Sequence, residues 1–85
     1  MNMLASFRNR TQALQFANQL KGMGVSIKII NTPREISTSC GLSIMFGVNS
    51  INRARVVINS NRFTSFMGFY LKKNNGRMYT YEKTN

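Results

Sequence analysis

The stretch Val25-Ser26-Ile27-Lys28-Ile29 alternates apolar and polar side chains, and Leu42-Ser43-Ile44-Met45-Phe46-Gly47-Val48 largely repeats that alternation after a polar interval. Strict alternation places the apolar side chains of each stretch on one face of a β-strand, and β-branched residues favour a strand further. We therefore predict two strands, at residues 25–29 and 42–48, each with one face directed into a hydrophobic core.

Helical spacing flanks these two strands. From Asn9 onward, apolar side chains recur at intervals of three and four residues, as in an amphipathic helix: Ala13, Phe16, Ala17, Leu20 and Met23. Asn9 or Thr11 can cap the start of this helix, and Gly22 and Gly24 can end it. A second helix is predicted from its cap at Ser50 to about Ser60, with this apolar face: Ile51, Ala54, Val57 and Ile58.

Strands are also predicted near both ends of the sequence. Residues 3–7 form a short apolar run, and residues 66–71 and 77–81 are rich in aromatic side chains. The turn residues Asn74-Asn75-Gly76 separate the last two runs, which indicates a C-terminal β-hairpin. The element order βαββαβ with a hairpin extension predicts an α+β, ferredoxin-like sandwich, in which two helices cover one face of an antiparallel sheet.

Length and composition limit the alternatives. A chain of 85 residues can enclose one hydrophobic core, so we predict a single domain, 1–85. No apolar run approaches the roughly 18 residues that cross a bilayer, and the N-terminal residues lack the layout of a secretory signal. We expect a cytoplasmic protein with no membrane partner.

The reactive side chains are few. The chain has one cysteine and no histidine, so we expect no internal disulfide, no metal site and no cofactor. Catalysis by a cysteine–histidine pair is excluded. The two carboxylates, Glu35 and Glu82, are far apart in the sequence, and an independent enzyme is therefore not expected.

The net charge of +10 would attract polyanions. The basic residues are spread from Arg8 to Lys83 without a dense block. A set of aromatic side chains near Lys72, Lys73 and Arg77 could stack on bases: Phe66, Phe69, Tyr70, Tyr79 and Tyr81. Ordinary cross-strand packing explains the same aromatics more simply. A small nucleic-acid-binding module remains the alternative function.

The interval between the two central strands contains the single thiol. Thr32 and Glu35 match a capping box, and Pro33 suits the first helical position, so a single helical turn is predicted to begin at Thr32. Small polar residues then surround Cys40: Ser37, Thr38, Ser39 and Gly41. An isolated cysteine is often a small buried hydrophobe, and that interpretation competes with a reactive thiol.

Several neighbours suit an accessible, negatively charged sulfur. Hydroxyl and backbone N–H groups can hydrogen-bond a thiolate or a persulfide anion, and Gly41 allows the backbone to approach closely. Arg34 would favour the anionic form, while the capping box would direct Glu35 away from the sulfur. A redox sensor, or a homodimer linked through Cys40, would use the same thiol.

The segment Thr-Pro-Arg-Glu-Ile-Ser-Thr-Ser-Cys-Gly-Leu, Thr32 to Leu42, closely resembles the hallmark segment of a bacterial family of small selenium or sulfur carrier-like proteins. The helix ending in Lys21-Gly22-Met23-Gly24 and the tyrosine-containing hairpin also resemble that family. The resemblance implies a carrier that holds sulfane sulfur or selenium on Cys40 and exchanges it with donor and acceptor proteins. It implies supporting roles for the rest of the segment: Pro33, Arg34, Glu35, Ser37, Thr38, Ser39 and Gly41.

Overall fold

The structure, a computed structural model, describes residues 2–38 and 40–84. Its five strands form one antiparallel sheet in the order β2-β3-β1-β4-β5. Their bounds are β1 (Asn2–Phe7), β2 (Ile27–Asn31), β3 (Leu42–Gly47), β4 (Phe66–Asn75) and β5 (Met78–Thr84). The helices are α1 (Arg10–Gly22), the short 3-10 helix η1 (Val48–Ser50) and α2 (Ile51–Ser60). The α+β class and the single sheet confirm the coarse prediction.

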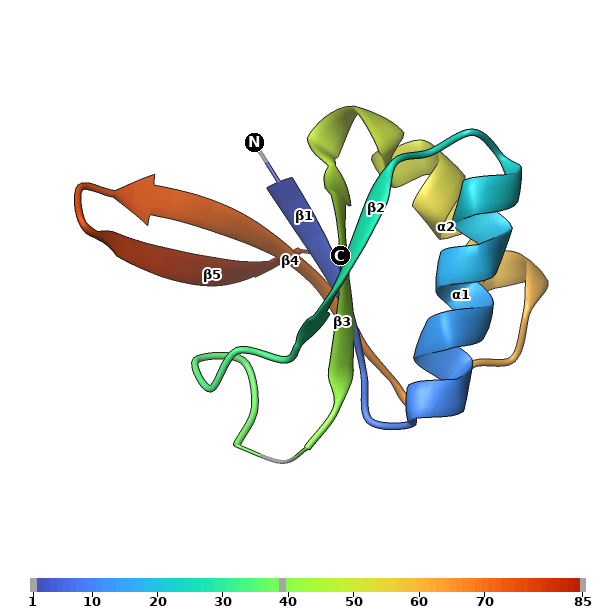
Figure 1. The fold of residues 1–85 in the computed structure, drawn as a ribbon, viewed down its shortest axis with the longest axis horizontal. Coiled ribbons are helices and arrows are strands. Elements are labelled where there is room, and N and C mark those ends of the chain that lie inside the picture. Colours follow the sequence, from blue (N-terminus) through green and yellow to red (C-terminus); the bar gives the residue numbers. More distant parts are fainter. Residues whose placement is uncertain (1, 39, 85) are drawn as a thin grey trace.

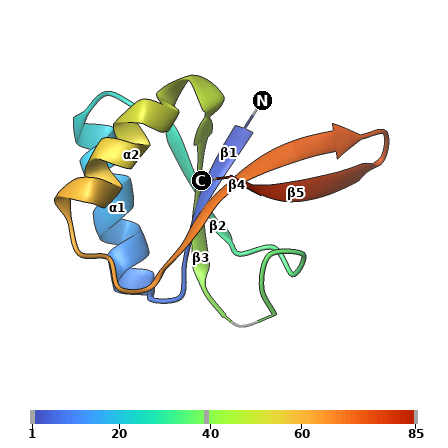
Figure 2. The ribbon, with the colours of Figure 1, turned by 180° about the vertical axis from the view of Figure 1, so that it is seen from behind.

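Both α-helices cover the same face of the sheet (Figure 1). The β4–β5 hairpin and the segment between β2 and β3 extend on the other side, as the view from behind also shows (Figure 2). Among the described residues, neither α-helix is long and apolar enough to span a bilayer. The sheet therefore separates the helix-covered core from the side toward which the cysteine segment and the β4–β5 hairpin extend.

The core lies between the sheet and the two α-helices, because the predicted apolar faces meet there. Its buried side chains come from β1, α1, β3, α2 and β4, and include Phe7, Phe16, Leu20, Ile44, Phe46, Ala54, Val57 and Phe69. Asn9 caps α1, since its side chain accepts a hydrogen bond from the Gln12 N–H at 3.0 Å. Gly24 follows the helix with a φ of +80°, a conformation that glycine adopts without strain.

The predicted ends of the first helix and the second strand were partly wrong. Val25 precedes β2, and its N–H donates to the Leu20 carbonyl at 3.1 Å, which closes the end of α1. Met23 is the C-terminal cap and is 41% exposed rather than buried. Ile29 is 42% exposed, whereas Ile27, on the same face of the edge strand β2, packs on the core.

Two further boundaries differ from the prediction. Ser50 occupies the N-cap position of α2 but makes no capping hydrogen bond through its side chain, and η1 precedes it. The hairpin strands are longer than their apolar runs, because β4 continues to Asn75, which pairs with Met78. The connection is therefore Gly76-Arg77, with Gly76 at a φ of +70°.

Candidate functional site

The cysteine loop, residues 32–41, is closed at its base by the backbone. The N–H of Thr32 donates to the carbonyl of Gly41 at 3.1 Å, directly after the β2–β3 pair Asn31 and Leu42. Residues 33–38 and Cys40 therefore lie in an excursion from the sheet, and the two ends of this excursion are held together by the same ladder that pairs β2 with β3.

One helical turn opens the loop. The carbonyl of Pro33 accepts hydrogen bonds from the N–H groups of Ile36, at 3.0 Å, and Ser37, at 3.1 Å. The capping box predicted for Thr32 and Glu35 is wrong, because the Thr32 hydroxyl lies 2.9 Å from the Ser43 hydroxyl instead. The predicted turn is present, but Thr32 contacts the sheet rather than capping the turn.

A chain of hydroxyl groups fastens the loop to the sheet. The Ser43 hydroxyl is hydrogen-bonded both to Thr32 and to Ser6, the latter at 2.7 Å. Ser6 and Ser43 are fully buried. A buried hydroxyl without a partner costs about 1–3 kcal/mol. The hydrogen bonds among these three side chains avoid that cost and so favour the observed position of the loop against the sheet. The alternation of residues 42–48 predicted that Ser43 lies on the face of β3 opposite the core. It did not predict that Ser43 is buried there.

Gly41 lies too close to β1 for any larger residue. A Cβ atom at this position would overlap the carbonyl oxygen of Phe7, a backbone atom that cannot swing away, and would touch the Thr32 hydroxyl oxygen at 3.4 Å. The missing side chain therefore allows the loop to return to the sheet directly beside β1.

We expect Gly41→Ala to lower the free energy of unfolding by about 1–3 kcal/mol, the usual cost of overpacking. Gly47, at the other end of β3, is the matched control, because a Cβ there meets no atom within 4 Å and its φ of −69° suits alanine. Gly47→Ala should change stability by less than about 1 kcal/mol. Urea unfolding measures both variants. Equal losses would show that the close approach at Gly41 has no special cost.

Cys40 is exposed, and its surroundings are polar and basic. It borders a hollow of about 340 Å³, here called the Cys40 hollow, which is lined by Arg10, Asn31, Thr32, Arg34, Ser37, Thr38, Cys40 and Gly41. The structure thus brings five of the predicted residues together: Cys40, Arg34, Ser37, Thr38 and Gly41. The alternative of a thiol buried as a small hydrophobe is wrong.

Arg10 is a residue of this hollow that the sequence analysis missed. Phe7 pairs with Leu42 in the antiparallel β1–β3 ladder, so the residues after β1 lie at the same end of the sheet as the residues before β3. Arg10 begins α1 just there. No local sequence signal links Arg10 to Cys40, because the link depends on β1 and β3 being neighbours in the sheet.

The remaining predicted residues have different places. Pro33 supplies the carbonyl of the helical turn, and Ser39 lies outside the described residues. Glu35 is not part of the Cys40 hollow. Its negative charge acts instead on Tyr81 of the hairpin, so the loop and β5 approach each other. Ile36 and Ser37 also border a second hollow with Tyr70 and Lys83.

The pKa of the Tyr81 phenol is raised above 10.0 by burial first, then by the charge of Glu35 and by Tyr79. We expect Glu35→Gln to lower this pKa only part of the way, because burial remains. Since the folded chain holds this proton more tightly, the stability it contributes is complete below pH 10.0 and is lost as the pH rises through the folded-state pKa.

Ultraviolet titration of tyrosinate measures this shift. Tyr70→Phe and Tyr79→Phe together leave Tyr81 as the single tyrosine, and the comparison is then made with and without Glu35→Gln in that background. An identical pKa in both chains would show that Glu35 does not act on Tyr81.

The donor set around Cys40 suits an anion. The hollow combines one thiol, two guanidinium groups and several hydroxyl groups, and its lining has no carboxylate. Among residues 2–38 and 40–84, no three side chains of the metal-binding types come together. Arginine side chains recognise anionic groups through several N–H donors in a fixed fork. The chemistry of this site is thus that of an exposed sulfur atom beside two cations.

A family model described as "Putative Se/S carrier protein-like" matches residues 2–66. The chain belongs to this family. The matched residues include the whole cysteine loop and both α-helices, whereas the β4–β5 hairpin lies almost entirely beyond them. Searches of curated proteins and of solved structures found no match. The family assignment agrees with the resemblance expected from the segment Thr32 to Leu42.

Proposed function

We propose that this family member carries sulfane sulfur or selenium on Cys40 and transfers it between a donor and an acceptor protein. The observation that supports this most directly is the exposed thiol in a hollow that it shares with Arg10 and Arg34. A terminal persulfide is an anion, and two nearby cations would attract it. The family description supports the class of cargo.

The transfer step needs no external oxidant. The Cys40 thiolate attacks the terminal sulfur of a persulfide on a donor cysteine. The bond between the two donor sulfurs breaks, a bond forms between that terminal sulfur and the Cys40 Sγ, and the electron pair leaves with the donor thiolate. The same step in reverse, with an acceptor thiolate as the nucleophile, unloads the carrier. Selenium bound to a donor cysteine would transfer in the same way.

The loop residues have supporting roles in this proposal. Arg10 and Arg34 would hold the negative charge of the bound cargo, and the hydroxyls of Ser37 and Thr38 could donate hydrogen bonds to it. Gly41 keeps the loop against β1. Three neighbours have further supporting roles in the proposal. Pro33 would hold the helical turn, Ser39 would supply a further hydroxyl group, and Glu35 would act through its approach to β5.

Two broader proposals accompany this function. The strand order β2-β3-β1-β4, together with two helices on one face, supports a ferredoxin-like fold to which the hairpin adds a strand. A carrier of this kind needs its thiol reduced before each loading, and the cytoplasm keeps thiols reduced. We therefore propose that the transfer takes place there, between partner proteins that present their own cysteines.

Loading with a donor tests the proposal. The purified chain is incubated with a cysteine desulfurase and cysteine, and intact mass spectrometry should show the added mass of one sulfur atom. A reductant should remove it, and prior alkylation of Cys40 should prevent it. If the thiol reacts with alkylating reagents but never gains sulfur, the carrier function is wrong. A covalent dimer under mild oxidant, without any sulfur adduct, would support the redox sensor or the thiol-linked homodimer instead.

A further inference from the structure

The side of the hairpin that faces away from α1 and α2 has an ordered arrangement of aromatic and basic side chains. Directly paired residues of an antiparallel ladder share a face of the sheet. Tyr70 pairs with Lys83, and Lys72 pairs with Tyr81, so each tyrosine lies opposite a lysine. Tyr79 lies on the same face, two residues before Tyr81. We call these five residues the Tyr/Lys face.

Within the Tyr/Lys face, cation and ring are already in contact. The Lys72 ammonium lies 4.1 Å from the centre of the Tyr79 ring. Tyr79 is 49% exposed, so part of its ring is open to a ligand. A hollow of about 360 Å³ lies beside it, lined by Asn2, Lys72, Asn74 and Tyr79. The hollow offers a ring surface, an ammonium group and two side-chain amides.

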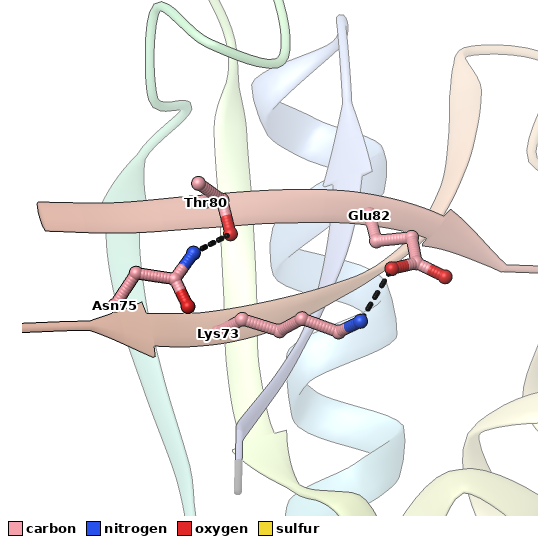
Figure 3. A network of polar contacts seen from close by, with 4 residues as sticks. All are labelled: Lys73, Asn75, Thr80 and Glu82. Atoms are coloured by element: carbon pink, nitrogen blue, oxygen red, sulfur yellow. Dashed lines mark hydrogen bonds and ion pairs between the residues drawn. The ribbon is translucent and has the colours of Figure 1, made fainter.

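The charges around the Tyr/Lys face favour an anionic partner. Glu82 is turned to the opposite face of the hairpin, where its carboxylate accepts a hydrogen bond from Lys73 at 2.6 Å (Figure 3). Glu35 is the acidic residue that acts on this side, through Tyr81. A further hollow of about 390 Å³ continues from Tyr70 and Lys83 to Arg8. Basic side chains therefore lie opposite the tyrosines, at Lys72 and Lys83, and continue beyond the Tyr70 end of the row to Arg8.

We infer that the Tyr/Lys face binds single-stranded nucleic acid, with bases stacked on Tyr79 and Tyr81 and phosphates held by Lys72 and Lys83. Base stacking on aromatic side chains beside a basic groove is how such strands are bound without sequence preference. Successive residues on one face of a strand are about 7 Å apart. This is roughly twice the 3.4 Å step per nucleotide of a duplex strand, so the tyrosines suit bases that are spread apart.

The inference is independent of the sulfur-carrier function. Residues 70–83 lie beyond the segment that matches the carrier family, and none of the five side chains lines the Cys40 hollow. It also revises the aromatic set that the sequence suggested. Phe66 and Phe69 pack against the helix-covered core, where Phe69 is 5% exposed, so they cannot stack on bases. The aromatic platform consists of the tyrosines alone.

Fluorescence anisotropy with labelled single-stranded oligouridylate and oligodeoxythymidylate tests the inference. Tyr79→Ala should weaken binding at least about fivefold, as expected when one stacked base is lost, while Tyr79→Phe should keep most of it. Met78, which is 72% exposed on the neighbouring position, supplies the control, and Met78→Ala should have little effect. Loading of Cys40 should be unchanged in all three variants, so the two functions fail separately.

Lys72 and Lys73 give a matched pair of charge changes on opposite faces of β4. Lys72→Gln should weaken binding and reduce the slope of log affinity against log salt by about 0.7, the value for one phosphate contact on a single strand. Lys73→Gln removes the same charge from the other face and should change binding much less. Glu35→Gln should strengthen binding, because it removes the acidic group near Tyr81.

Three results would overturn the inference. Equal losses in Lys72→Gln and Lys73→Gln would show attraction by net charge alone. Heparin or anionic phospholipid vesicles that bind as tightly as the oligonucleotides, with no effect of Tyr79→Ala, would show a surface for any polyanion. Tighter binding of duplex than of single strands would contradict the role of the exposed tyrosine rings.

Discussion

Cys40→Ser is expected to abolish the sulfur-bearing form of the protein completely. Cys40 is the single cysteine of the chain, and a serine hydroxyl is neither a nucleophile for a persulfide at neutral pH nor able to form a stable bond to sulfur. Because the side chain is exposed, the substitution should leave the fold and its thermal stability nearly unchanged. Intact mass spectrometry after incubation with the desulfurase should show only the unmodified chain.

A relocated thiol separates the role of the Cys40 hollow from the role of a thiol as such. Among residues 2–38 and 40–84, Met78 is the most exposed of the large apolar side chains, and it lies outside the hollow. Cys40→Ser combined with Met78→Cys therefore moves the thiol to an open surface. We expect this chain to gain sulfur much more slowly than the natural one. Equal rates would show that Arg10 and Arg34 contribute nothing to loading. Arg10→Ala and Arg34→Ala should each slow loading without abolishing it.

Phe16→Ala is expected to cause the largest loss of stability, about 3–5 kcal/mol. The Phe16 ring is fully buried, and its centre lies 5.2 Å from that of Phe7, 6.5 Å from Phe46 and 6.3 Å from Phe63. It therefore joins α1 to β1, to β3 and to the segment before β4. A domain of this length is typically stable by about 4–13 kcal/mol, so the cavity would remove a large part of the total.

Leu14 on the same helix supplies the control, since it is 42% exposed and Leu14→Ala should cost less than about 1 kcal/mol. Urea unfolding followed by circular dichroism measures both. If Phe16→Ala does not fold, Phe16→Leu keeps most of the volume and should show a smaller loss in the same direction. A loss no greater than that of Leu14→Ala would mean that the aromatic cluster does not hold the core together.

The elements with one clearly buried face could be predicted from the sequence. The apolar spacing of α1 and the alternation of β3 place Phe16, Leu20, Ile44 and Phe46 in the core, as the structure shows. Residues at the edge of the sheet were predicted less well. Ile29 is an apolar residue in an alternating strand, so it was predicted to face the core. It lies on an edge strand, and periodicity along the chain does not reveal which strand lies at the edge.

The candidate site divides in the same way. The segment around Cys40, with Arg34 and its hydroxyl neighbours, could be selected from local sequence because small polar residues surround the thiol. The hydroxyl chain from Thr32 through Ser43 to Ser6 could not, since its members are separated by as many as 37 positions. Thr32 matched a local capping motif in the sequence, but in the structure its hydroxyl is hydrogen-bonded to Ser43 of β3.

By itself, the sequence of this protein determined the helices, the strands, the α+β class and the one thiol available for chemistry, because these depend on the order of neighbouring residues. Only the tertiary structure decided that Arg10 faces the Cys40 hollow, that the phenylalanines of β4 pack against the core while the tyrosines of the hairpin lie on the other face, and that Gly41 touches β1. These contacts join residues far apart in the chain, and strand pairing and packing alone bring them together.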